Sequence, residues 1–226
     1  GIGESRIENV IRLRNAGITA PIMLLRIPPI SSVSEVVEYV DVSLNSEMKV
    51  LSALSEAALE TGKVHDVIIM VDLGDLREGV WPDDIPLFME RASALEGIRV
   101  TGIGTNLSCY GGVIPTTENM NNLVRVADGI EQQFGLSMNI ISGGNTSALP
   151  LMMEGGMPKR LNQLRIGEGI MLGRDTIEGK PWPGTGQQAF TIRAEIIELK
   201  KKPSKPIGST ARDAFGNTPT FNDKGI

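Results

Sequence analysis

The sequence has one cysteine, one histidine and only 4% aromatic residues among its 226 residues. A single thiol, Cys109, excludes an internal disulfide and a cysteine-based zinc site, and it is typical of a reducing cytoplasm. With His65 as the single histidine, the sequence disfavours a catalytic nucleophile of the Ser/His or Cys/His type. No apolar run approaches the roughly 20 residues of a membrane span, and the N-terminus has no signal-peptide pattern. We therefore expect a cytoplasmic globular protein without a metal site.

The chain also lacks an excess of positive charge. Its 22 basic and 27 acidic residues give a formal net charge of −5, and the two signs are mixed along the sequence. The one cationic run, at residues 200–202, is expected in a solvated turn. This pattern disfavours a nucleic-acid or membrane surface and leaves a small molecule as the expected partner.

What the sequence does contain is a regular alternation of short apolar runs and amphipathic helical patterns. The apolar runs predict strands at residues 22–26, 40–44, 66–73, 99–105, 138–142 and 163–166. Between them, the periodicity predicts helices at residues 5–16, 33–39, 46–61, 85–95, 117–134 and 147–155. Strand–helix units of this spacing predict the α/β class, with a parallel sheet whose closed form is a (β/α)8 barrel of the TIM type.

The two ends of the chain depart from this alternation. Residues 1–5 have the pattern of a strand end that runs straight into a helix. We therefore expect residues 1–185 to form a barrel that lacks its first unit. Residues 191–199 alternate like a long strand and lead into a turn-rich segment. This change predicts that residues 186–226 begin a C-terminal β-domain.

Two glycine-containing segments, at residues 141–147 and 164–173, follow neighbouring predicted strands. In the first, Ser142, Asn145 and Thr146 offer hydrogen-bonding groups beside two glycines, which let a ligand approach the backbone closely. Late βα loops of barrels commonly bind phosphate in this way. Together the segments predict a site for a phosphorylated cofactor or substrate, whereas the first one alone is as typical of a helix-capping turn without a ligand.

Charged side chains lie at the ends of two of the predicted strands, 163–166 and 66–73. Arg165 on a barrel strand needs a partner, which is either a ligand or a carboxylate such as that of Asp72 or Glu168. The loop after strand 66–73 has charged residues that either bind a charged substrate or form a salt-bridged rim: Asp72, Asp75, Arg77 and Glu78.

The loop after strand 99–105 contains an amide, a thiol and a phenol, at Asn106, Cys109 and Tyr110. Cys109 is a candidate acid–base group. A free cysteine is more often a small, inert packing residue, and the sequence favours that interpretation.

Several of these segments together resemble one family, the PLP-dependent alanine racemase superfamily, in its alanine/ornithine racemase-like branch. The segments are SRIEN (5–9), SLNS (43–46), VDLGDLREG (71–79), GTNLSCYGG (104–112), ISGGN (141–145) and DAFG (213–216). The resemblance covers nearly the whole chain. It implies a barrel that binds pyridoxal 5′-phosphate (PLP), followed by a β-domain.

The resemblance also implies roles for individual residues. Asn145 and Thr146 match a phosphate-binding pair of the family, and Gly167 and Glu168 match the backbone amides that complete the phosphate site. Arg165 matches the arginine that faces the pyridine nitrogen of PLP. Two residues match positions beside the cofactor ring: Arg77, near the phenolic oxygen, and Asn106, where alanine racemases have a histidine.

By the same resemblance, the parent protein is an amino-acid racemase, an isomerase that interconverts L- and D-amino acids by two-base proton exchange at Cα. The family's Schiff-base lysine lies at the end of the first barrel strand, and its second base is a tyrosine of the C-terminal domain of the partner in a homodimer. We expect this chain to contain neither residue and to be inactive alone. Substrate selectivity is expected from Asp75, Cys109 and Tyr110. An acidic rim suits a diamino acid such as ornithine, while alanine and serine stay open.

Two other functions remain open at this point. The first is a non-catalytic PLP-binding barrel that manages cofactor supply, against which the segment at 213–216 argues because that family ends at the barrel. The second is a sugar-phosphate TIM-barrel enzyme without PLP. It requires acid–base carboxylates at strand ends, and only Asp72 and Glu168 qualify.

Overall fold

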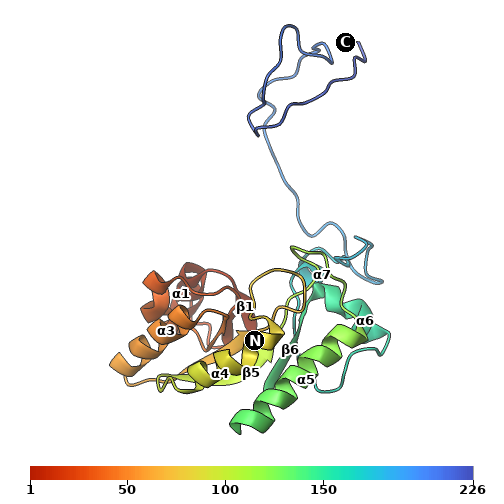
Figure 1. Ribbon diagram of the computed structural model, residues 1–226. Coiled ribbons are helices and arrows are strands. Elements are labelled where there is room, and N and C mark those ends of the chain that lie inside the picture. The colour runs from red at the N-terminus through yellow and green to blue at the C-terminus, as the bar shows by residue number, and fades with distance from the viewer. Residues whose placement is uncertain (226) are drawn as a thin grey trace. The chain divides into compact units, whose positions relative to one another are not determined.

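The computed structural model describes residues 1–225, and the chain divides into two compact units, Gly1–Ala189 and Phe190–Ile226. All helices and strands of the described residues belong to the first unit. Its seven strands form one parallel sheet in chain order (Figure 1). The strands are β1 (Ile2–Glu4), β2 (Ile22–Leu24), β3 (Val42–Asn45), β4 (His65–Met70), β5 (Ile98–Gly104), β6 (Ile140–Asn145) and β7 (Gln163–Arg165).

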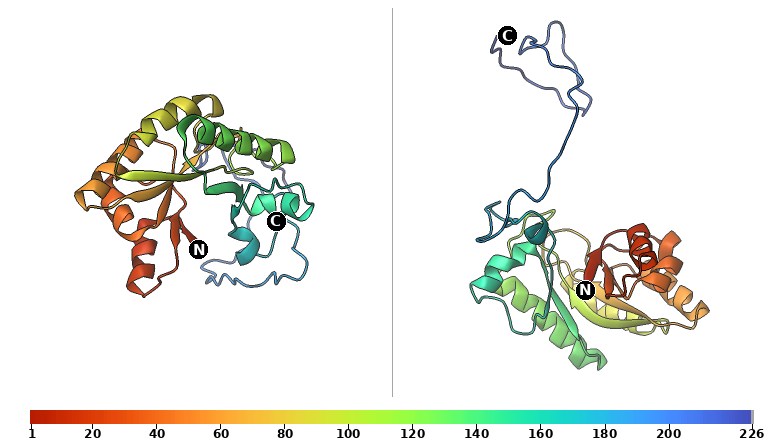
Figure 2. Two further views of the ribbon diagram at one scale, coloured as in Figure 1. Left: turned by 90° about the horizontal axis from the view of Figure 1, so that it is seen from below. Right: turned by 180° about the vertical axis from the view of Figure 1, so that it is seen from behind.

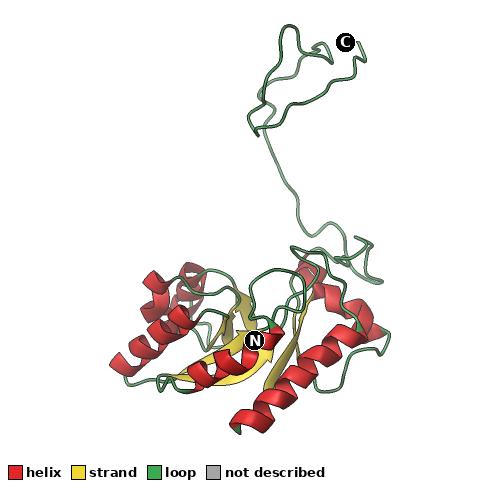
Figure 3. Ribbon diagram, viewed as in Figure 1, coloured by secondary structure: helices red, strands yellow, loops and turns green. Residues whose placement is uncertain are grey.

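Helices follow the strands and cover the outside of the sheet (Figure 3). The α-helices are α1 (Ile7–Asn15), α2 (Val33–Tyr39), α3 (Met48–Glu60), α4 (Ile85–Ser93), α5 (Thr117–Phe134), α6 (Leu149–Met153) and α7 (Glu168–Met171). Short 3-10 helices precede α2, α4 and α6, at Ile30–Ser32, Pro82–Asp84 and Thr146–Ala148. The predicted strand–helix alternation is confirmed.

The sheet curves into a nearly closed barrel, as the view from below in Figure 2 shows. Each strand pairs in parallel with the next, and within residues 1–225 the two end strands, β1 and β7, do not pair with each other. The predicted α/β barrel is therefore confirmed, with seven strands instead of eight. Strand β6 extends three residues beyond its predicted end because Asn145 pairs with Arg165 of β7.

Two apolar layers stabilise this unit. Side chains alternate between the faces of a strand, so Ile69 and Ile103 pack outward against helices while Ile68 and Leu44 belong to a smaller inner cluster. The outer layer includes Leu51 of α3, which is fully buried. Each such side chain contributes roughly 1.5–3 kcal/mol of burial free energy.

Helix α5 shows how local sequence sets an element's ends. Thr116 accepts a hydrogen bond from the Asn119 amide, and the Asn119 side chain accepts one from the Thr116 amide, which completes a capping box. The helix ends at Gly135, whose φ of 66° is left-handed and favours glycine.

The second unit contains no helix or strand within its described residues, 190–225. The prediction of a strand over 191–199 was therefore wrong. A strand needs a neighbour for its backbone N–H and C=O groups and a surface for its apolar face. Here Ile192 and Ile197 are 95% and 96% exposed. The first compact unit ends at Ala189, and the division of the chain into a barrel domain (1–185) and a β-domain (186–226) stays a prediction.

Within residues 1–225, no helix combines the length and hydrophobicity that crossing a bilayer requires.

Candidate active site

The carboxyl ends of the strands, with the loops that follow them, surround a cavity of about 160 Å³. Residues from widely separated parts of the chain line it, among them Leu44, Met70, Arg77, Glu78, Asn106 and Arg165. Parallel strands bring their carboxyl ends to one edge of the barrel, which is where barrel enzymes bind their ligands. The predicted positions Arg77, Asn106 and Arg165 therefore meet at one site.

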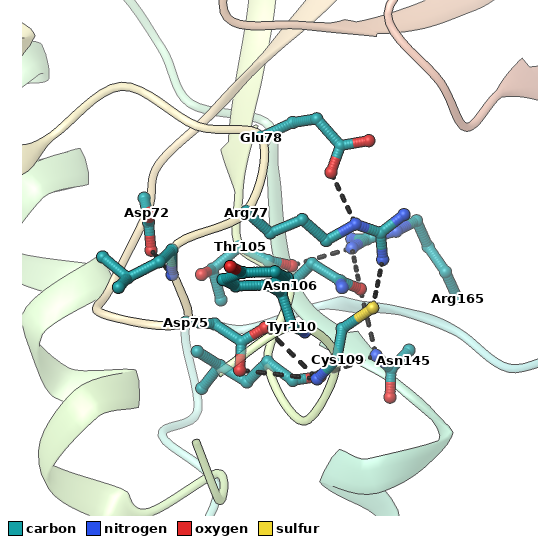
Figure 4. A network of polar contacts seen from close by, with 12 residues as sticks. Asp72, Asp75, Arg77, Glu78, Thr105, Asn106, Cys109, Tyr110, Asn145 and Arg165 are labelled. Atoms are coloured by element: carbon teal, nitrogen blue, oxygen red, sulfur yellow. Dashed lines mark hydrogen bonds and ion pairs between the residues drawn. The ribbon is translucent and has the colours of Figure 1, made fainter. Parts of the chain in front are cut away.

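Arg165 is the last residue of β7, and its guanidinium bonds across the barrel to the neighbouring strands (Figure 4). It donates to the Thr105 carbonyl oxygen at 2.7 Å, to Asn106 Oδ1 at 3.4 Å and to Ser142 Oγ. Burial, together with the positive charge of Arg77, lowers the pKa of Arg165 to about 10. The group therefore remains protonated at neutral pH.

No carboxylate of residues 1–225 forms an ion pair with Arg165; its acceptors are a carbonyl, an amide and a hydroxyl oxygen. Asp72, one of the two predicted partners, instead accepts the amides of Gly74 and Leu76 through Oδ1 at 2.9 and 3.2 Å. Glu168, the other, is exposed at the start of α7. Because its acceptors are neutral, this partly buried guanidinium favours an anionic or hydrogen-bond-accepting ligand in the cavity.

A second arginine lies at the same mouth. Arg77 Nη1 donates to Cys109 Sγ at 3.0 Å, and its Nε forms an ion pair with Glu78. Figure 4 shows the two guanidinium groups side by side. The rim predicted at this loop is therefore partly salt-bridged, and the pair of arginines makes the site favourable for an anionic ligand.

The predicted phosphate segment surrounds the end of β6. Asn145 donates through Nδ2 to Asn106 Oδ1 at 3.0 Å and to the Leu107 carbonyl oxygen at 2.9 Å, while its Oδ1 accepts the Ser147 amide at 2.8 Å. Thr146 Oγ1 accepts the amide of Gly169 at 3.2 Å, which joins the two glycine-containing segments. The structure thus brings the segments together as predicted. The Asn145 side chain stabilises the turn, and the hydroxyl groups of Thr146 and Ser147 can donate hydrogen bonds to a ligand.

Three buried polar atoms at this site have no hydrogen-bond partner in the part of the chain that the structure describes. They are Thr105 Oγ1, Asn106 Nδ2 and Ser147 Oγ. A buried polar atom left without a partner costs about 1–3 kcal/mol, so these atoms indicate a place where a polar ligand completes the bonding. Sequence reasoning assigned no role to Thr105; its only signal was its place as the last residue of the predicted strand 99–105, and in the structure it directly follows β5.

Gly167 and Glu168 lie opposite this segment, at the start of α7. A Cβ at Gly167 would meet no atom within 4 Å, so its backbone borders open space. Glu168 is the first residue of α7, and its side chain is exposed. The backbone at Gly167 is therefore accessible near Thr146, whose Oγ1 bonds to the amide of Gly169.

The predicted substrate-side residues lie in two adjacent loops and differ in exposure. Tyr110 is 78% exposed, and Cys109 is exposed beside Arg77. Asp75 is fully buried, and both of its carboxylate oxygens accept backbone N–H groups of residues 109–113. Asp75 therefore offers no free carboxylate at the rim, whereas Glu78 lines the cavity.

The chain matches known proteins over most of its length. Residues 1–175 match the family described as alanine racemase, N-terminal domain. The chain is 46% identical over 224 residues to the ornithine racemase of Acetoanaerobium sticklandii, covering 99% of this chain and 63% of that protein. It is 43% identical over 225 residues to the lysine racemase of Thermotoga maritima, covering 100% of this chain and 63% of that protein. The chain thus spans less than two thirds of these curated relatives.

A solved structure supports the same fold. The alanine racemase of a D-cycloserine-producing Streptomyces lavendulae superposes with a TM-score of 0.64 at 22% identity, over 76% of this chain and 45% of that chain. The family match, which includes every strand of the barrel, and the shared fold lead to one conclusion. The chain belongs to the alanine racemase family, and its residues 1–175 match the N-terminal domain of that family.

Proposed function

We propose that the protein to which this chain belongs is a PLP-dependent amino-acid racemase. The observation that supports this most strongly is Arg165, a partly buried cation that faces a cavity and has no carboxylate partner among residues 1–225. The family match and the two racemase relatives agree with it.

The residues at the mouth fit PLP by their chemistry. A phosphate needs donors, and the unpaired Ser147 hydroxyl, the Thr146 hydroxyl and the accessible backbone at Gly167 would supply them. A pyridine nitrogen is an acceptor, and the Arg165 guanidinium would donate to it. Asn106 and Arg77 would flank the ring, because both line the same cavity.

When bound, PLP withdraws electrons from the Cα of an attached amino acid, which makes the Cα proton removable. Arg165 would limit this withdrawal. With a pKa of about 10 it keeps its own proton at neutral pH, so it would donate only a hydrogen bond to the ring nitrogen. This arrangement would favour return of a proton to Cα over transamination. Racemisation needs a proton acceptor on each face of Cα, and we place the lysine and the tyrosine that supply them outside residues 1–226.

We propose a basic diamino acid as the substrate. The two relatives described above are named for ornithine and lysine. Glu78 lines the cavity and is the carboxylate that would attract a distal ammonium group. Because Glu78 already pairs with Arg77, the substrate would share this carboxylate with the arginine.

The rival functions find less support at the site. A sugar-phosphate enzyme needs an accessible carboxylate at a strand end that faces the ligand. Asp72 is committed to the turn that contains Gly74 and Leu76, and Glu168 is exposed but is not among the residues that line the cavity. A PLP-binding barrel without catalytic activity predicts the same cofactor contacts, and it differs from a racemase in turnover.

Reductive trapping tests the proposal. Two chains are compared: the 226-residue chain, and a chain extended at both ends to the length of the curated relatives. Each is incubated with PLP and treated with borohydride, and its mass is measured by intact mass spectrometry. The extended chain is then assayed with L-ornithine, L-lysine and L-alanine, with the D-enantiomer measured by chiral chromatography. Arg165→Gln in the extended chain, which removes the cation and keeps a donor, is the matched variant.

We expect one pyridoxyl adduct on the extended chain only, at a lysine that precedes residue 1, together with faster turnover of ornithine or lysine than of alanine. An adduct on the extended chain without turnover of any of the three amino acids would favour the PLP-binding barrel. The absence of an adduct on both chains would overturn PLP chemistry. A homodimer and a cytoplasmic location belong to the same proposal, and sedimentation of the extended chain tests the first.

A further inference from the structure

Two loops at the mouth of the barrel are held together by one side chain. The Asp75 carboxylate, in the loop after β4, accepts the backbone amides of Tyr110 and Val113 at 2.9 Å each and that of Cys109 at 3.2 and 3.4 Å. The Asp75 carbonyl oxygen accepts the Gly111 amide at 2.8 Å. The amides of four residues therefore fix the loop after β5 to the loop after β4, and Figure 4 shows Asp75 beside Cys109 and Tyr110.

The environment of Asp75 requires a carboxylate. Its side chain is fully buried, and no Lys, Arg or His among the described residues forms an ion pair with it. Backbone amides alone therefore stabilise the carboxylate. An asparagine of the same shape would have one acceptor oxygen, and its NH₂ group would face amide donors.

The backbone on both sides of this contact is strained. Leu76 has φ 56° and Ser108 has φ 53°, and within residues 1–225 these are the non-glycine residues with positive φ. Such conformations persist only where surrounding contacts hold them, and they concentrate at binding and catalytic sites. One of these residues directly follows Asp75, and the other directly precedes Cys109.

The two loops also approach too closely for larger residues. A Cβ at Gly111 would lie 2.8 Å from the Asp75 carbonyl oxygen. The contact between the loops is therefore a specific backbone fit, and it has a consequence for the site. Cys109, whose amide bonds to Asp75, accepts a hydrogen bond from Arg77 through its Sγ at 3.0 Å.

We propose that Asp75 is a positioning residue that fixes the 107–113 loop, and through Cys109 the guanidinium of Arg77, at the mouth of the cavity. Asp75 does not contact the amino acid itself. It positions the loop that contacts the side chain of the amino acid, and this loop includes Cys109 and Tyr110. This assignment rests on the proposed function for its effect on substrate, whereas the contact between the loops stands independently of it.

The contact is tested in the 226-residue chain, without cofactor, by amide hydrogen exchange. In the unsubstituted chain we expect the amides of Cys109, Tyr110 and Val113 to exchange slowly. Asp75→Asn should accelerate them at least about tenfold, while amides of α5 stay unchanged. The control is Asp83→Asn, an exposed aspartate of the Pro82–Asp84 turn. Rapid exchange of the three amides in the unsubstituted chain would overturn the proposal even if Asp75→Asn fails to fold.

The effect on substrate is tested in the extended chain loaded with PLP. Loss of positioning removes binding that ground state and transition state share, so Asp75→Asn should raise KM for the diamino acid about tenfold and change kcat much less. Cys109→Ala should raise KM as well, and the double variant should show no further increase. An equal loss of kcat and kcat/KM, or an unchanged KM, would refute the positioning role. A chain that lacks racemase activity altogether would refute the proposed function, while hydrogen exchange still decides the contact.

Discussion

His65 provides the sharpest test of the electrostatics in this fold. Its side chain is 3% exposed at the start of β4, and its Nε2 lies 2.8 Å from Ser43 Oγ on β3. Burial lowers the pKa of His65 to about 4, against the opposing charges of Asp66 and Asp41. In the unfolded chain His65 has a pKa near 6.5. Between about pH 4 and pH 6.5, therefore, His65 is protonated in the unfolded chain and neutral in the folded chain.

The sign and size of the effect follow from linkage. The unfolded state binds more protons between about pH 4 and pH 6.5, so the free energy of unfolding rises with pH across this window and is lost as the pH falls. Between about pH 7.5 and about pH 5 the two pKa values give a loss of about 2 kcal/mol from this one group. His65→Gln does not titrate and can still bond to Ser43, so it lacks this component.

Urea unfolding monitored by circular dichroism measures the free energy of unfolding of both proteins at the two pH values. All other titrating groups are common to both, so the difference between the two losses isolates His65. An NMR titration of the imidazole of the folded chain is the independent check, with no shift expected until the pH approaches about 4. Equal losses in both proteins, or an imidazole that titrates near pH 6.5, would refute the reasoning.

Three further predictions follow from individual contacts. Arg165→Gln should weaken PLP binding by the extended chain about thirtyfold, equivalent to about 2 kcal/mol for a charged donor, as measured by cofactor absorbance. Gly102→Ala would place a Cβ 2.1 Å from the Ile140 carbonyl oxygen and should cost about 3 kcal/mol in urea unfolding. Its control Gly129→Ala, in α5 with no atom within 4 Å, should stabilise by about 0.5–1 kcal/mol. Thr116→Ala removes the cap of α5 and should cost about 1 kcal/mol in the same assay.

The sequence predicted the barrel well because its signals are local. Each strand of a parallel sheet is a short apolar run, and each helix has its own 3.6-residue periodicity. Arg165 was also identifiable, since a cation within a predicted barrel strand conflicts with burial. What failed was the strand over 191–199, because strand formation depends on a neighbour and not on alternation alone.

The role of Asp75 was beyond sequence reasoning for a related physical reason. An acidic residue at a strand end looks the same whether it faces substrate or backbone. Its partners Cys109 and Val113 lie 34 and 38 residues away, and the fold alone brings their amides together. The same holds for the Thr105 carbonyl oxygen, which Arg165 reaches from 60 residues away. Long-range backbone contacts have no signature in residue type.

The electrostatic balance of the mouth links these observations. Arg77 has Glu78 as a partner, whereas Arg165 has only neutral acceptors within the described part of the chain, and the charge of Arg77 disfavours its protonated form further. An anionic ligand between them would therefore relieve a destabilisation that is present in the free protein, in addition to making its own hydrogen bonds. Because such a ligand binds only the folded state, it adds about 2.7 kcal/mol of stability at one hundred times its dissociation constant. Proteins commonly give up stability in this way at their ligand-binding sites. Here Arg165, which has no carboxylate partner among residues 1–225, lies at the same end of the barrel as the polar atoms without hydrogen-bond partners of Thr105, Asn106 and Ser147.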